Sequence, residues 1–186
     1  MLRIDPAVYP FGALLILTIP LPWLLAAFFS ATLHEMAHIA AILILDGSIQ
    51  QIEISICTAK IYAYIPSPKK EFICALAGPL GSLIAVSLVH LFPRLAICAL
   101  IQGVFNLLPV YPLDGGRALY CLLQLYLPEQ ATAISARISN GLLYLLLFFS
   151  VGGEIIFSTG PIPVAMILLF LYKRKKTCKQ PRIGIQ

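Results

Sequence analysis

Long apolar stretches, interrupted by prolines and glycines, constrain the fold of this chain more than any other feature. Only 11% of its 186 residues are Asp, Glu, Lys or Arg, whereas soluble domains carry about 25%. The apolar segments are residues 7–19, 23–45, 72–92, 95–109, 138–157 and 161–172. Because a transmembrane helix needs about 20 mostly apolar residues, the sequence predicts an all-α polytopic membrane protein with about six transmembrane helices.

The positions of the basic residues predict the orientation of these helices. With six crossings and both termini in the cytoplasm, every Lys and Arg except Arg94 lies on the cytoplasmic side, as the positive-inside rule requires. We therefore expect an intramembrane core at residues 1–172 and a basic cytoplasmic tail at 173–186, in a bacterial cell membrane. The net charge of +5 indicates contact with the lipid bilayer and no nucleic-acid partner.

The pattern changes from helix to strand between the second and third apolar segments. Residues 48–65 are rich in isoleucine and tyrosine, and apolar and polar residues alternate in part, which predicts a small membrane-associated β-hairpin. Two roles are open for this hairpin. It is either a simple connector or an exposed edge that holds an extended polypeptide by strand addition, with Ile54, Ile56 and Tyr62 facing the lipid or that polypeptide.

The second apolar segment contains the run His34-Glu35-Met36-Ala37-His38. Two histidines at this spacing lie on one face of a helix and are placed to bind one zinc ion. Ionisable groups at membrane depth cost about 2.5–3.5 kcal/mol each on insertion scales, so they indicate a function. The alternative is that the histidines only hydrogen-bond between helices while Glu35 pairs with a cation. No Lys or Arg lies in a neighbouring apolar segment to do so.

A catalytic zinc ion usually has three protein ligands and one open position, so a third ligand must come from elsewhere. Asp114 has the most suitable setting, because two prolines interrupt the helix before it and two glycines allow close packing after it. An open alternative is that Asp114 pairs with Arg117 in a solvated loop. The other acidic candidates are Asp46, Glu53, Glu71, Glu129 and Glu154.

Taken together, these motifs resemble the site-2 protease family of intramembrane zinc metalloproteases. The resemblance rests on the H-E-x-x-H run, on Gly-x-x-x-Ser at residues 78–82 and on Asn-x-x-Pro-x-x-x-x-Asp-Gly at residues 106–115. The last stretch is most similar to the branch that contains stage IV sporulation protein FB. The resemblance covers most of residues 7–172.

The resemblance implies a role for each residue of these motifs. His34, His38 and Asp114 would bind one Zn²⁺ per chain, Glu35 would be the catalytic base, and Asn106 would stabilise the oxyanion. These roles agree with the chemistry, because zinc lowers the pKa of a bound water to about 7 and a side-chain amide is a suitable oxyanion donor. For the Gly-x-x-x-Ser motif we expect helix packing.

The activity implied by the resemblance is zinc-dependent hydrolysis of a peptide bond in or near a transmembrane segment. The substrate would be a single-span or membrane-associated protein such as a sigma or anti-sigma factor. An alternative is a catalytically inactive relative that binds membrane proteins without cutting them, although the intact Glu35 argues against it. A metal transporter would need several ligand clusters across the bilayer, and this sequence has one. The sequence does not indicate an oligomeric state.

Overall fold

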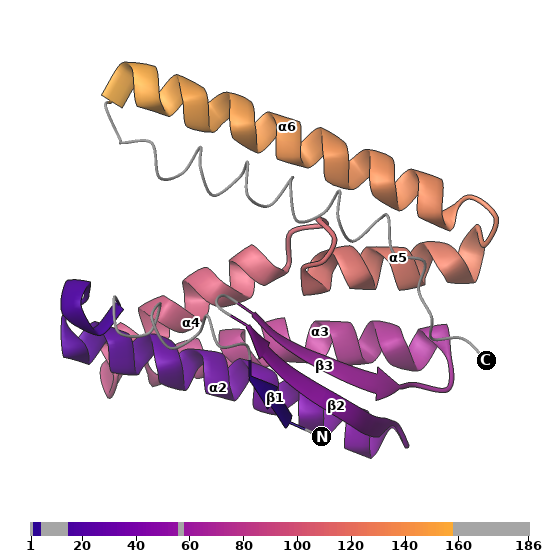
Figure 1. Cartoon of the computed structure of the whole chain (residues 1–186), viewed down its shortest axis with the longest axis horizontal. Coiled ribbons are helices and arrows are strands. Elements are labelled where there is room, and N and C mark those ends of the chain that lie inside the picture. Colours follow the sequence, from indigo (N-terminus) through magenta and orange to yellow (C-terminus); the bar gives the residue numbers. More distant parts are fainter. Residues whose placement is uncertain (1, 5–14, 56–57, 158–186) are drawn as a thin grey trace.

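The computed structural model describes residues 2–4, 15–55 and 58–157 (Figure 1). In chain order the elements are β1 (Leu2–Ile4), α2 (Leu21–Ile44), β2 (Ser48–Ser55), β3 (Thr58–Tyr64), α3 (Pro68–Ala85), α4 (Pro93–Asn106), α5 (Asp114–Tyr126) and α6 (Ala131–Phe157). A 3₁₀ helix at Val86–His90 follows α3 directly. The expected last apolar segment, the basic tail and most of the expected first segment lie outside the described residues.

Prolines mark the starts of three helices. Each of α2, α3 and α4 has a proline in its first turn, where the missing N–H costs no helical hydrogen bond. Helix α3 begins at Pro68, earlier than the apolar pattern predicts, because the side chain of Ser67 accepts a hydrogen bond from the backbone N–H of Lys70. This cap lets the first turn include charged residues that a search for apolar residues leaves out.

Helix α2 shows the burial pattern of a membrane helix. Many of its large apolar side chains, such as Phe28, Phe29 and Leu33, are exposed, whereas most of its buried side chains are small or polar. The buried residues recur every fourth position and are Ala26, Ser30, His34, His38 and Ile42. This is the reverse of a soluble helix, and it fits a helix that presents its large apolar side chains to lipid and packs through small residues.

Three helical segments are long and apolar enough to cross a membrane within the described residues. They are Leu21–Ile44, Pro68–His90 and Ala131–Gly153. The predicted class, a mostly helical membrane protein with a small hairpin, is therefore confirmed. The expected number of about six crossings stays a prediction, since α4 has 14 residues and two expected segments lie wholly or partly outside the described residues.

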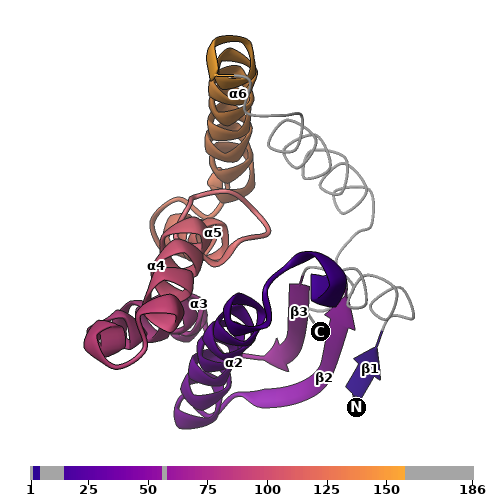
Figure 2. The same ribbon diagram turned by 90° about the vertical axis from the view of Figure 1, so that its left-hand side faces the viewer.

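The predicted hairpin is present, and it belongs to a three-stranded sheet with the order β1-β2-β3. Strands β2 and β3 pair antiparallel, while β1, which no local sequence pattern predicts, pairs parallel with β2. Ile54 lies on the central strand, but its side chain and the whole of Ile56 lie outside the described part of the structure, so the direction that these two residues face stays a prediction. Among the described strands β3 is an edge. The sheet lies beside α2, on the side away from α4 (Figure 2).

Helix α5 was not anticipated, because residues 110–137 lie between two of the predicted apolar segments. The structure instead begins a helix at Asp114, where a carboxylate is favoured by the positive end of the helix dipole. Helices α3, α4 and α5 bury small residues, which allow neighbouring backbone segments to approach closely. These residues are Cys74, Ala75, Gly78, Ser82, Ala96, Ala99, Gly103, Gly115, Gly116 and Ala118.

Candidate metal centre

Two helices bring three potential metal ligands to one point. His34 and His38 project from α2, and Asp114 is the first residue of α5. The Oδ2 atom of Asp114 lies 3.0 Å from Nε2 of His34 and 3.1 Å from Nε2 of His38. The three residues are 2%, 7% and 9% exposed. Within the described residues, this group of His, Cys, Asp and Glu side chains could hold a metal ion.

Each histidine is held by its other ring nitrogen. Nδ1 of His38 donates a hydrogen bond of 2.8 Å to the backbone carbonyl of Cys74 in α3. Nδ1 of His34 is hydrogen-bonded to the hydroxyl of Ser82, also in α3, at 2.9 Å. Hydrogen bonds of this kind fix the orientation of the ring and leave Nε2 for the metal, as is usual for metal-binding histidines.

The donor set fits a zinc ion. Because a carbonyl oxygen only accepts hydrogen bonds, the proton of neutral His38 is on Nδ1, and its Nε2 carries a lone pair. That lone pair faces the carboxylate of Asp114, so two acceptors stand 3.1 Å apart and a cation between them would relieve the repulsion. Zn–N and Zn–O bonds of about 2.0–2.1 Å in a tetrahedron place ligand atoms roughly 3.3 Å apart, close to the observed separations.

The carboxylate of Asp114 is held in its charged form. Burial alone would raise its pKa, but when the imidazoles of His34 and His38 carry a proton on Nε2, their hydrogen bonds and charge outweigh burial and hold the pKa of Asp114 below its ordinary value. The alternative pairing with Arg117 is not what the structure shows. The guanidinium of Arg117 lies 3.8 Å from Oε1 of Glu71, so it neutralises a different carboxylate.

The other acidic candidates do not join the group. Asp46 is paired with Lys70 at 3.1 Å and is 85% exposed. Glu71 faces Arg117, and Glu129 is exposed. The side chains of Glu53 and Glu154 lie outside the described part of the structure. Of the acidic residues whose side chains are described, Asp114 is the one that completes a group with the two histidines.

Glu35 and Asn106, the two residues with expected catalytic roles, both border the centre. Glu35 is half-buried and interacts electrostatically with His34, His38 and Asp114. Asn106 is the last residue of α4, and its Nδ2 lies 3.4 Å from Nε2 of His34. A carboxylate and an amide therefore stand beside the three potential ligands, and their catalytic roles stay predictions.

The Gly-x-x-x-Ser motif both packs α3 against α2 and supports the centre. A Cβ at Gly78 would overlap the imidazole of His38, and a Cβ at Gly81 would come within 2.6 Å of the Cβ of Ala37. The last residue of the motif, Ser82, makes the hydrogen bond to His34. Packing, which we expected, explains the glycines, but the serine has a further role that sequence reasoning missed.

A second polar contact lies next to the centre. The hydroxyl of Ser30 donates a hydrogen bond of 2.7 Å to Oε1 of Gln102. Ser30 precedes His34 by one turn of α2, and Gln102 precedes Asn106 by one turn of α4. The pair thus joins the same two helices one turn before His34 and Asn106. The sequence signal that could have revealed it is the polar residue four positions before a ligand in an otherwise apolar segment.

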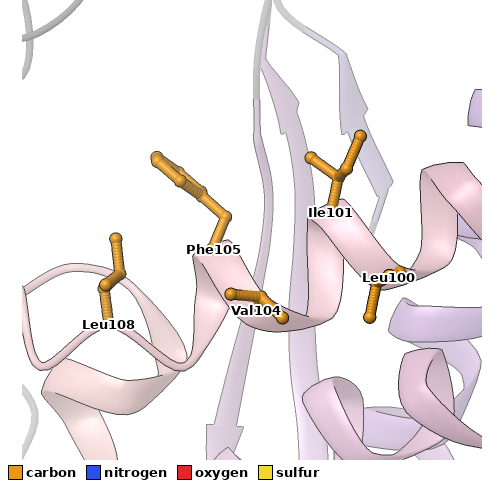
Figure 3. Close-up of a pocket in the computed structure, with 5 residues that line it drawn as sticks. All are labelled: Leu100, Ile101, Val104, Phe105 and Leu108. Carbon is orange, nitrogen blue, oxygen red and sulfur yellow. The ribbon is translucent and has the colours of Figure 1, made fainter.

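An apolar hollow of about 380 Å³ lies on the outer face of α4 (Figure 3). That face is turned away from the buried residues Ala99 and Gly103, which pack against the rest of the bundle. Since the side chains that line the hollow are aliphatic or aromatic, it offers no catalytic or metal-binding group. Its lining residues are Leu100, Ile101, Val104, Phe105 and Leu108.

Comparison with known proteins agrees with this centre. Residues 75–149 match the profile of Peptidase family M50. The matched segment includes the motif at residues 78–82 and the stretch from Asn106 to Asp114, but not the histidines of α2. No curated protein matches the sequence.

The fold is similar to that of a solved site-2 protease. The chain is similar to the site-2 protease from Methanocaldococcus jannaschii, with a TM-score of 0.70 and 22% sequence identity over 100% of this chain and 94% of that one. The likeness establishes a site-2 protease fold. Neither comparison separates the branch of stage IV sporulation protein FB from other branches.

Proposed function

We propose that this protein is an intramembrane zinc endopeptidase that cuts a peptide bond in or near a transmembrane segment of a membrane protein. The observation that carries the proposal is the convergence of the Oδ2 atom of Asp114 on the Nε2 atoms of His34 and His38. The match to Peptidase family M50 and the site-2 protease fold support the same activity.

Each residue of the centre would have a separate role in the reaction. His34, His38 and Asp114 would hold Zn²⁺, which polarises a carbonyl oxygen and lowers the pKa of water to about 7. Glu35 would accept a proton from the attacking water and pass it to the leaving amine. The amide N–H of Asn106 would donate to the developing charge on the scissile carbonyl oxygen, an interaction worth about 2.7–4 kcal/mol in comparable sites.

A transmembrane substrate must be extended before its amides can be attacked, because a helix hides them in internal hydrogen bonds. Strand β3 would supply the template, since it is an edge of the described sheet and its residues Tyr62 and Tyr64 are 46% and 57% exposed. Proline scanning at Ile61 and Tyr62 tests this role. The backbone N–H groups of successive residues in β3 point alternately toward β2 and away from the sheet. One of the two prolines therefore removes a hydrogen bond to β2, and the other removes only an N–H group that points away from the sheet. The variant that keeps the pairing with β2 should cleave more slowly while binding zinc normally.

The setting follows from the same sequence arguments. The protein would be a multi-pass protein of a bacterial cell membrane, with both termini in the cytoplasm, and its substrates would be single-span or membrane-associated proteins. The similarity of residues 106–115 to the branch of stage IV sporulation protein FB supports a sigma factor or anti-sigma factor as substrate.

The deciding experiment uses purified protein in detergent and a tagged single-span substrate. We expect cleavage that stops when a zinc chelator is added and returns when zinc is restored. Glu35→Gln should bind zinc but not cleave, while the matched change Glu129→Gln, at an exposed residue, should cleave normally.

Each other outcome has a defined meaning. Cleavage that persists in Glu35→Gln would contradict the proposed chemistry. Substrate capture by the wild-type protein without any cleavage would favour the alternative, a binding relative without catalytic activity.

A further inference from the structure

The connection between α4 and α5, residues 107–113, is flanked at each end by a residue of the centre. Asn106, just before it, lies 3.4 Å from His34, and Asp114, just after it, lies 3.0 Å from the same Nε2 atom. The connection itself has no regular secondary structure between these two residues. A shift of residues 107–113 would therefore move a metal ligand and an amide donor together.

One side chain from outside the connection is bonded to its middle. The hydroxyl of Ser139, in α6, donates to the carbonyl of Pro109 at 3.1 Å and accepts from the backbone N–H of Tyr111 at 3.3 Å. A single hydroxyl thus serves as donor and acceptor for the two residues that flank Val110. Ser139 is fully buried and Val110 is 1% exposed, so both lie in the packed interior.

The opposite side of the connection is closed by the first turn of α5. A Cβ at Gly115 would overlap the backbone of Leu107, and a Cβ at Gly116 would overlap that of Val110. The connection is therefore held between α5 and α6, and it lies on the side of α5 that faces α6 (Figure 1). Helix α6 supplies none of the three potential ligands, but its hydroxyl restrains the backbone that presents Asp114.

We propose that Ser139 is a positioning residue for the metal centre, acting through the Pro109–Tyr111 backbone to hold Asp114 and Asn106 against His34. This inference deepens the proposed function and rests on its zinc site. Removing the hydroxyl leaves the carbonyl of Pro109 and the N–H of Tyr111 without this partner, and the connection would then relax away from its present position. Removal of a supporting residue of this kind typically lowers metal affinity 10–100-fold.

The test is zinc affinity, measured by competition with a chromogenic chelator in detergent. We expect Ser139→Ala to weaken zinc binding roughly tenfold and to lose cleavage at limiting zinc but recover it when zinc is in excess. The matched control is Ser135→Ala, the same change at a buried serine one turn earlier in α6. It should bind zinc like the wild type.

Thermal unfolding of the metal-free proteins separates positioning from general stability. If Ser139→Ala unfolds at a lower temperature than Ser135→Ala yet binds zinc with wild-type affinity, its role is structural and the proposal is wrong. A wild-type protein that binds no zinc would also overturn it. Zinc binding that weakens as expected in a protein that never cleaves a substrate would contradict the proposed function and leave this inference standing.

Discussion

The Nε2 atom of His38 lies 3.1 Å from the Oδ2 atom of Asp114, a residue 76 positions later in the chain. The proton of His38 is on the opposite nitrogen, where it is bonded to the carbonyl of Cys74. When His38 is neutral, two electron-rich atoms therefore face each other in a buried site, an arrangement that is costly without a metal ion or a proton between them. The centre is accordingly built for a positive charge, and the imidazole and carboxylate donors suit zinc.

Replacing Asp114 should weaken zinc binding. Asp114→Asn keeps the size of the side chain but removes its charge, so we expect zinc affinity to fall by more than the roughly 10–100-fold that the loss of a supporting residue costs. Metal content after dialysis, measured by atomic emission, checks the prediction. Asp46→Asn is the matched control, since Asp46 is exposed and paired with Lys70. Stoichiometric zinc in Asp114→Asn would show that this carboxylate is not a ligand.

The hydroxyl of Ser82 should matter through the orientation of His34. Ser82→Ala removes the 2.9 Å hydrogen bond to Nδ1, so the ring would be free to turn and zinc affinity should fall about 10–100-fold. Ser87→Ala provides the comparison, because that exposed hydroxyl donates to the carbonyl of Ile84 in its own turn. Equal zinc affinity in the two variants would rule out a role for Ser82 in positioning His34.

The residues of the centre could be predicted from sequence because each has a strong local signal. The spacing of His34 and His38 and the prolines and glycines around Asp114 are visible in the chain itself. The hairpin was also predictable, since isoleucines and tyrosines with partial alternation are typical of strands. What these signals have in common is that they depend on neighbours in the sequence.

The remaining features depend on contacts between distant segments. The start of α5 at Asp114 was missed because two glycines and an arginine follow it, and such residues do not resemble an apolar helix. The parallel pairing of β1 with β2 joins residues such as Leu2 and Ile52, which no local pattern connects. Similarly, nothing in the residues around Ser82 shows that its hydroxyl reaches a ring in another helix.

The contact between Ser30 and Gln102 should stabilise the packing of α2 against α4. Hydrogen bonds between membrane helices contribute about 0.6 kcal/mol on average, so we expect a coupling energy of that size in a double-mutant cycle of Ser30→Ala and Gln102→Leu. Unfolding in a mixed detergent system would measure it. Because the pair lies one turn before His34 and Asn106, each single variant should also lower kcat more than it raises KM. Additive losses of stability would show that the two side chains are not coupled.

Two glycines offer the sharpest contrast between a close contact and an open surface. Gly78→Ala would force a methyl group into the ring of His38, and since backbone atoms of α3 cannot give way cheaply, we expect loss of zinc binding and of cleavage. Gly141→Ala meets nothing within 4 Å and should leave zinc binding unchanged. It should also raise stability by about 0.5–1 kcal/mol, because alanine loses less conformational entropy in a helix. Zinc titration and thermal unfolding of both variants test the pair. Wild-type zinc affinity in Gly78→Ala would mean that α3 can move away from His38 without disturbing the centre, which would contradict the close packing described above.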